Sequence, residues 1–257
     1  MNTKYKTDND DWNEHWKNVN FLAKYNPGQI LRHRLVLNTV HNLKIKQGWV
    51  LIDFGSGQGD MIKRLSDKFT ELKMIGLEYS EFGVQFSIEN NQSAEFLVAD
   101  LTSPNLNSSL QLKADIITCC DVMEHIDNPE SVVKNAYAML NIGGTFIVTL
   151  PGGPMSILDK HIGHRRHYNR TSLEDLLREG GFRKYNVYSA GWPFFNLYRY
   201  MLLARGEKLI KDVSSETSVI KTAAIKIIGF IFALLFKLNL SNTLFGWQMF
   251  AIAEKID

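Results

Sequence analysis

Alternating glycines follow directly on a short apolar run at residues 50–52. Asp53 ends that run, the sequence GSGQG occupies residues 55–59, and a helical pattern starts at Met61. A strand, a glycine turn and a helix in this order bring backbone N–H groups close to a ligand, because glycine has no Cβ to block the approach. The pattern indicates a nucleotide-like ligand, with a turn that binds nothing as the alternative. Asp60 stands where the dinucleotide fingerprint requires its third glycine, which disfavours NAD(P).

A second polar signal stands at the end of the next apolar run, residues 73–79. Glu78 lies about twenty residues beyond the glycine turn, where nucleotide-binding α/β folds place a carboxylate for the two ribose hydroxyls. Tyr79 beside it is expected to stack on an adenine face. The glycine turn and Glu78 together specify a nucleotide much better than either does alone.

A third acid, Asp100, follows the apolar run at residues 95–99. We expect its carboxylate to accept a hydrogen bond from an adenine amino group, with the backbone of Leu101 beside the ring edge, because ligands of open α/β sheets bind at strand ends. The alternative is a turn or helix cap, since Thr102, Ser103 and Pro104 come next.

Histidines form two groups that are candidates for a general base, a residue that removes a proton from a substrate, because histidine is the usual base near neutral pH. His125 follows the strand expected at 114–120, and His161 and His164 lie in the segment DKHIGHRRHYNR, after the strand expected at 145–150. The same segment carries hydrogen-bond donors that could bind an anionic substrate, such as a phosphate or carboxylate. These donors are Arg165, His167 and Tyr168. A solvated basic turn, whose arginines pair with surface acids, is the alternative. Histidines at every third position do not share one helical face, so no metal site is expected.

The chain has 257 residues and ordinary globular composition, which fits a single α/β domain with additions. Residues 1–47 are expected to form an N-terminal helical cap and residues 48–257 the main domain. The net charge of +2 is too small to indicate a nucleic-acid partner. The adjacent Cys119 and Cys120 offer no disulfide framework, and the first ten residues hold no apolar signal segment, so a cytoplasmic, reducing location is expected.

The periodicity of hydrophobic residues predicts the helices and strands that position these side chains. Helices are expected over 8–21, 30–43, from 61, 81–89 after a Ser80 cap, 129–140, and 171–179 after a Thr171 cap. Strands are expected at 50–52, 73–79, 95–99, 114–120, 145–150, 182–190 and 244–254. Pro27 and Gly28 are expected to break the chain before the second helix, and residues 141–144 to end the helix before the fifth strand.

The run at residues 115–152, DIITCCDVMEHIDNPESVVKNAYAMLNIGGTFIVTLPG, carries the order D-x-I-x, E-H-I, P and L-x-x-G-G. With the glycine turn, Glu78 and Asp100, this segment resembles the class I S-adenosylmethionine-dependent methyltransferases of the small-molecule, methyltransferase-11/23-like type. The resemblance covers residues 48 to 190. It implies a Rossmann-like, seven-stranded, mostly parallel sheet with helices on both faces and an antiparallel last strand beside the sixth.

The resemblance also implies S-adenosylmethionine as the cofactor and assigns residues to it. The methionine half is expected to be surrounded by Asp53, Gly55, Ser56, Gly57 and Gly59. Glu78 is expected to bind the ribose, Tyr79, Asp100 and Leu101 the adenine, and Cys120 and Asp121 to lie under the sulfonium. The N-terminal helices either cover the cofactor or pack on the sheet edge. No Asn/Asp-Pro-Pro-aromatic motif follows the fourth strand, which argues against methylation of exocyclic base nitrogens. From the motifs together we expect a small or lipid-like acceptor, methylated at oxygen.

Residues 191–243 separate the last two strands and form the most unusual segment. They carry seven Lys/Arg and three acids, a charge of +4, and the ten-residue apolar run 227–236. Ten apolar residues are too few to span a bilayer. We expect helices that either lie on an anionic membrane or cover an apolar pocket, with Trp192 at the acceptor, or else pack internally or in a dimer.

Two other functions stay open at this point. A catalytically silent methyltransferase-like subunit would bind a membrane or partner through residues 191–243. An NAD(P)-dependent oxidoreductase is less well supported because of Asp60. The sequence leaves the acceptor and the oligomeric state open.

Overall fold

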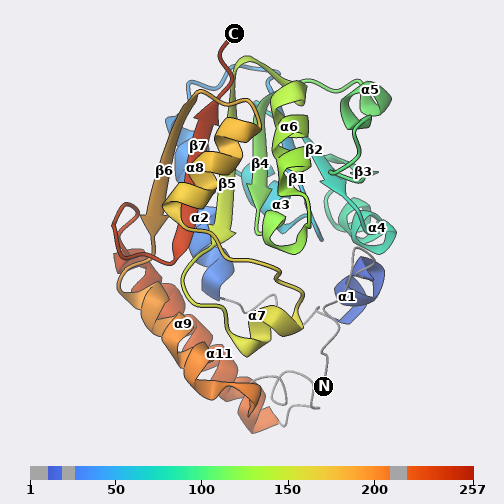
Figure 1. Cartoon of the computed structure of the whole chain (residues 1–257). Helices are drawn as coiled ribbons and strands as arrows, with labels where there is room; N and C mark the ends of the chain where they lie inside the picture. Colours follow the sequence, from blue (N-terminus) through green and yellow to red (C-terminus); the bar gives the residue numbers. More distant parts are fainter. Residues whose placement is uncertain (1–10, 19–26, 209–218) are drawn as a thin grey trace.

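The computed structural model describes residues 11–18, 27–208 and 219–257, and its centre is one seven-stranded sheet (Figure 1). The strand order is β3-β2-β1-β4-β5-β7-β6. The strands are β1 Val50–Phe54, β2 Lys73–Glu78, β3 Glu95–Val98, β4 Ala114–Cys120, β5 Leu140–Pro151, β6 Lys184–Ala190 and β7 Gln248–Glu254. β7 runs antiparallel between β5 and β6, whereas the other neighbouring pairs are parallel. The predicted fold class, including the antiparallel last strand, is confirmed.

Helices cover both faces of the sheet, because the central strands are apolar on both sides. On one face, Ile52 and Ile117 pack against α6 (Pro129–Met139) and α8 (Arg170–Glu179). On the other face, Leu51 and Ile116 pack against α2 (Pro27–Asn42) and α3 (Asp60–Ser66). These four strand side chains are completely buried. The two-sided core fixes the carboxyl ends of β1, β2, β3 and β4 at one edge of the sheet.

Shorter helices complete the fold. Those near the carboxyl edge are α1 (Trp12–Asn18), α4 (Glu81–Asn90), η2 (Met123–His125) and α7 (Ile157–His161), whereas α5 (Leu106–Leu110) lies at the opposite end, before β4 (Figure 1). Ser80 caps α4 by accepting from the Gly83 backbone N–H at 3.0 Å, which confirms the predicted cap. Of the first predicted helix, positions 8–10 and 19–21 lie outside the described residues.

Several predicted boundaries are wrong. The last strand begins at Gln248 and not at residue 244, and three other differences have a local cause. Pro27 does not break the chain but is the first residue of α2, where its missing N–H costs nothing. Asn169, not Thr171, caps α8, in a capping box with Ser172. The segment 141–144 belongs to β5, which begins at Leu140, because Asn141 donates to Asp115 at 3.0 Å and Leu140 pairs with Ala114.

The described part of the segment 191–243 includes α9 (Phe194–Arg205) and α11 (Val219–Leu235), which lie side by side below the sheet, and η3 (Phe236–Leu238) after them (Figure 1). Tyr198 of α9 contacts the rings of Phe232 and Phe236, and both phenylalanines join the core on the α2 face. Among the described residues, no helix is long and apolar enough to cross a bilayer.

Candidate cofactor and acceptor site

The glycine turn between β1 and α3 requires glycine at its alternate positions. Gly55, Gly57 and Gly59 have φ values of +72°, +55° and +80°, a region that L side chains rarely adopt. The backbone N–H groups of Gly55 and Ser56 donate to the Leu77 carbonyl at 2.8 and 3.0 Å. The turn is therefore held against β2, and its backbone faces the strand ends.

Glu78 lies directly on this turn. Its Oε2 accepts from the Gly57 N–H and its Oε1 from the Ser80 N–H, both at 2.9 Å. Burial raises the pKa of the Glu78 carboxyl, whereas the Ser80 and Gly57 N–H groups and the Trp16 side chain oppose this. The carboxylate is 5% exposed, and each oxygen keeps a second acceptor position. This geometry fits a pair of ribose hydroxyls.

Helix α1 packs on the glycine turn and on the start of α4. A Cβ at Gly57 would lie 2.7 Å from the Trp16 ring, and the Gln58 amide donates to the Trp16 carbonyl at 3.2 Å. Asn13 Oδ1 lies 2.8 Å from Ser80 Oγ and accepts from the Phe82 N–H. Of the two roles considered for the N-terminal helices, α1 occupies the position of a cover over the turn.

Two acids stand at the ends of the central strands, Asp53 buried and Asp121 partly exposed. Asp53 accepts a hydrogen bond from the Thr118 hydroxyl at 2.6 Å. Burial raises the pKa of the Asp53 carboxyl to about 7; the nearby Glu78 carboxylate adds to this rise, and the Thr118 hydrogen bond opposes it. Asp121, directly after Cys120, forms an ion pair with Arg32 of α2 at 2.8 Å and has a φ of +53°. A non-glycine residue in this conformation carries strain that is common at functional sites.

The residues expected to hold adenine lie beyond β2 and β3. Asp100 is exposed, and its Oδ1 accepts from both the backbone N–H and the hydroxyl of Thr102, at 2.8 and 2.7 Å. The turn considered as the alternative role is therefore present. Tyr79 is 54% exposed, and the Leu101 side chain is buried while its carbonyl accepts from the Asn135 amide. Adenine binding by these three residues stays a prediction.

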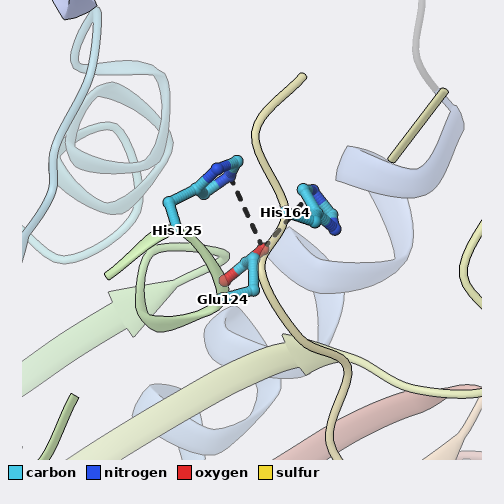
Figure 2. A group of neighbouring side chains, drawn as sticks. All are labelled: Glu124, His125 and His164. Atoms are coloured by element: carbon cyan, nitrogen blue, oxygen red, sulfur yellow. Dashed lines mark ion pairs between the residues drawn. The ribbon is translucent and has the colours of Figure 1, made fainter. Parts of the chain in front are cut away.

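A second cluster follows β4, where Glu124, His125 and His164 point toward one another (Figure 2). Glu124 Oε1 lies 4.0 Å from His125 Nε2 and 4.0 Å from His164 Nε2. The Glu124 side chain is completely buried. Burial lowers the pKa of His125 to about 4 and that of His164 to about 2, so both rings are neutral at pH 7.

His167, Asp159 and Arg199 extend this cluster. His164 Nδ1 lies 3.1 Å from His167 Nε2, and His167 Nδ1 lies 3.0 Å from the Gly153 carbonyl. Asp159 lies 3.8 Å from His167 and binds both terminal nitrogens of Arg199, at 2.9 and 2.6 Å. Burial opposes ionisation of Asp159, yet the Arg199 contacts hold its pKa at about 2. Arg199 thereby ties α9 to the loop after β5.

Four residues predicted for catalysis or acceptor binding do not belong to the Glu124, His125 and His164 group, although the backbone N–H of Arg165 donates to the Glu124 carbonyl at 2.8 Å. His161 is exposed at the end of α7. Arg165 pairs with Asp127 at 2.8 Å, as the basic-turn alternative expected. The Tyr168 ring is buried and its hydroxyl donates to the Met123 carbonyl at 3.2 Å, and acceptor binding by this residue stays a prediction. Trp192 packs against Phe245, with ring centroids 5.8 Å apart.

Sequence reasoning missed five residues of this region: Trp16, Arg32, Glu124, Asp159 and Arg199. Glu124 had a usable signal, because it is an acid next to His125 directly after a strand. Trp16 contacts Gly57 and Gln58, Arg32 pairs with Asp121, and Asp159 pairs with Arg199. The partners in these contacts are 40 or more positions apart, so neither residue type nor spacing indicates a role.

Comparisons with known proteins agree with this geometry. The profile of the family described as "Methyltransferase domain" matches residues 18–187. The ubiquinone biosynthesis O-methyltransferase of Pseudomonas putida is 25% identical over 117 residues, which is 45% of this chain and 50% of that protein. Phosphoethanolamine N-methyltransferase 3 of Arabidopsis thaliana is 25% identical over 191 residues, 69% of this chain and 38% of that protein. The chain thus spans half or less of the length of these relatives.

A solved structure shares the fold. It is Haemonchus contortus phosphoethanolamine N-methyltransferase 2 in complex with S-adenosylmethionine, with a TM-score of 0.57 and 17% identity, covering 87% of this chain and 52% of the other. The glycine turn and the buried Glu78 fit the same cofactor, whose sulfonium supplies an activated methyl group. Because the family profile matches more than half of its residues and the sheet is seven-stranded with the expected antiparallel last strand, the chain belongs to the class I S-adenosylmethionine-dependent methyltransferases.

Proposed function

We propose that the chain transfers the methyl group of S-adenosylmethionine to an oxygen atom of a small or lipid-like acceptor. The observation that carries this proposal is the arrangement of strand ends: Glu78 on the glycine turn after β1, and the Glu124–His125 cluster after β4. A cofactor site and a group of neutral histidines thus lie at one edge of the sheet. Among the relatives, the names of an O-methyltransferase and of an N-methyltransferase support methyl transfer.

The histidines supply the features that an oxygen acceptor requires. An acceptor hydroxyl must lose its proton, and a neutral imidazole offers a lone pair for it. His164 is oriented by His167, and His167 by the Gly153 carbonyl. Methyl transfer from a sulfonium depends mainly on alignment of donor and acceptor, and such positioning can lower a barrier by several kcal/mol, up to roughly 7–11.

The direct test is a titration of the purified protein with S-adenosylmethionine, followed by incubation of a cell extract with cofactor that carries a labelled methyl group. We expect saturable binding and a labelled small or lipid product. Absence of binding would reject the proposal. Binding without any labelled product would favour the silent subunit, and a copurified nicotinamide cofactor would favour an oxidoreductase.

We further propose that α9 and α11 place the enzyme on an anionic membrane, where a lipid-like acceptor is found. Ile227 and Phe230 of α11 are 60% and 65% exposed, and the exposed apolar surface continues over Leu197, Tyr200 and Met201 of α9 and over Leu238, Leu244 and Phe245. An apolar area of this extent on a soluble body indicates a binding surface.

Basic groups border this surface and favour anionic lipid. A cavity of about 310 Å³ lies between α2, α3 and α11. Its polar lining consists of His33, Arg34, Asn38, Arg64, Lys68 and Lys237. Cations next to exposed apolar side chains suit a phospholipid, whose head group is charged and whose chains are apolar.

A flotation assay tests this contact. We expect the wild type to float with vesicles that contain anionic lipid, and a Phe230→Asp variant to lose most of this association, because a charge on the apolar face opposes insertion. Ile142→Asp is the matched control, since Ile142 is 72% exposed at the start of β5, away from both helices. Equal flotation of wild type and Phe230→Asp would contradict the proposal.

A further inference from the structure

Glu124 is a buried carboxylate that lacks a hydrogen-bond donor among the described residues. Its side chain is 0% exposed, and neither Oε1 nor Oε2 has a hydrogen-bond partner there. A buried, unpaired carboxyl is costly, because it loses water and gains nothing in return. Protonation would not remove this cost, since the nearest imidazole nitrogens lie 4.0 Å away, beyond hydrogen-bond distance.

A metal ion would resolve this arrangement. One oxygen of Glu124 and one ring nitrogen each of His125 and His164 lie within 4.8 Å of one another. Ligand atoms that each lie about 2.1 Å from a tetrahedral zinc ion are about 3.4 Å apart, so the 4.0 Å distances from the Glu124 oxygen to the two imidazole nitrogens must each shorten by about 0.6 Å to bind one ion. The cluster is therefore slightly wider than an occupied metal site and needs only a small closing movement of the side chains.

The hydrogen bonds around His164 orient its free lone pair toward Glu124. The Gly153 carbonyl can only accept, so His167 Nδ1 donates to it and His167 Nε2 is left as an acceptor. His164 Nδ1 must then donate to His167 Nε2, at 3.1 Å. The remaining nitrogen, His164 Nε2, carries a lone pair and is the atom 4.0 Å from Glu124 Oε1. Metal-binding histidines are typically held by such an outer hydrogen bond.

A neighbouring group, Asp159, His164 and His167, also has metal-like spacing but is less suitable. Asp159 already binds two nitrogens of Arg199, and both nitrogens of His167 are engaged. Glu124 has no such partner among the described residues. The geometry points to the first group.

We propose that Glu124, His125 and His164 bind one divalent transition-metal ion, for which Zn²⁺ is the reference probe. Two imidazoles and one carboxylate favour Zn²⁺, Fe²⁺ or Mn²⁺ over Mg²⁺ and Ca²⁺, which prefer oxygen ligands. Three protein ligands leave a coordination position free. In a role that rests on the proposed function, an ion there holds the acceptor oxygen and lowers the pKa of its hydroxyl.

Metal loading tests the proposal without reference to activity. The full chain is stripped with a chelator, incubated separately with Zn²⁺, Mn²⁺, Fe²⁺ under exclusion of oxygen, and Mg²⁺, desalted, and analysed for bound metal. We expect about one Zn²⁺ per chain and little Mg²⁺. Cobalt substitution should give the visible absorption bands of a site with nitrogen and oxygen ligands.

Variants assign the ligands. Glu124→Gln and His164→Ala should each lower Zn²⁺ affinity at least about 100-fold, and His167→Ala, which removes only the outer hydrogen bond, about 10-fold. Glu71→Gln and His41→Ala are the matched controls, because both residues are exposed and lie outside the cluster. Circular dichroism verifies folding, and should Glu124→Gln not fold, His164→Ala and His125→Ala carry the test.

Two results would overturn the metal site. One is wild-type protein that retains less than about a tenth of an equivalent of every ion. The other is folded His164→Ala protein that binds as much Zn²⁺ as the wild type. S-adenosylmethionine titrations of stripped protein are run in parallel, so loss of the metal proposal is distinguishable from loss of the proposed methyl transfer.

Discussion

A Gly57→Arg variant is expected to bind S-adenosylmethionine at least about 100-fold more weakly than the wild type. Gly57 has a φ of +55°, which costs an L residue roughly 1–2 kcal/mol. A Cβ there would lie 2.7 Å from the Trp16 ring. The rest of an arginine side chain must take space either from α1 or from the ligand. The Gly57 N–H also holds Glu78 Oε2 at 2.9 Å, so a shifted turn would misplace the carboxylate as well. Isothermal titration with the cofactor measures the loss.

Gly143→Arg separates this local effect from backbone strain in general. Gly143 also has a positive φ, +79°, but no atom lies within 4 Å of a Cβ built there, and it belongs to the exposed start of β5. We expect Gly143→Arg to retain the wild-type affinity for the cofactor. Wild-type affinity in folded Gly57→Arg protein would mean that the cofactor does not use this turn.

The cofactor half of the site was predictable because its geometry is local. Each strand end is marked by a change from apolar to polar residues, and parallel strands bring those ends to one edge. Gly57 and Glu78 could therefore be placed together although 21 residues separate them. The seven-stranded, mostly parallel sheet with its antiparallel last strand was implied by the family resemblance, and it is confirmed.

The candidate acceptor half was only partly predictable, because its contacts are set by packing and not by strand order. His125 and His164 were named individually, but the carboxylate between them was not. The expectation that the histidines cannot form a metal group considered one helix alone. It overlooked that Glu124 and His125 could be brought to His164 from another element, as the structure does. The predicted N-cap of α8 was wrong for a similar reason. Asn169 and Thr171 are both acceptable caps, and only the capping box with Ser172 decides between them.

The segment 191–243 contains a charged residue whose contact could likewise not be predicted from the sequence. Arg199 lies on α9, in a stretch that its aromatic neighbours mark as apolar. Its partner, Asp159, is 40 residues away in α7, and no periodicity connects them. The two side chains are 11% and 3% exposed, so the ion pair is buried. This contact attaches α9 to the loop that carries His164 and His167.

Arg199→Ala is expected to lower the free energy of unfolding by about 3 kcal/mol. Removing one partner of a buried ion pair leaves the other charge unpaired in a poorly solvated position, and such changes typically cost about 3–5 kcal/mol. Asp159 would lose two contacts, at 2.9 and 2.6 Å, and keep only the backbone N–H of Ser156 and the nearby His167. Urea unfolding followed by circular dichroism measures the change.

A surface pair provides the comparison that gives this result its meaning. Arg170 and Glu174 are 60% and 34% exposed in α8, and pairs of this kind contribute about 0.3–0.5 kcal/mol. Arg170→Ala should therefore hardly move the urea midpoint, whereas Arg199→Ala should move it strongly. If Arg199→Ala and Arg170→Ala had equal free energies of unfolding, Asp159 would have to be exposed to water and not buried against Arg199. The loop that carries His164 and His167 would then not be attached to α9, and the orientation of His164 toward Glu124 would lose its structural support.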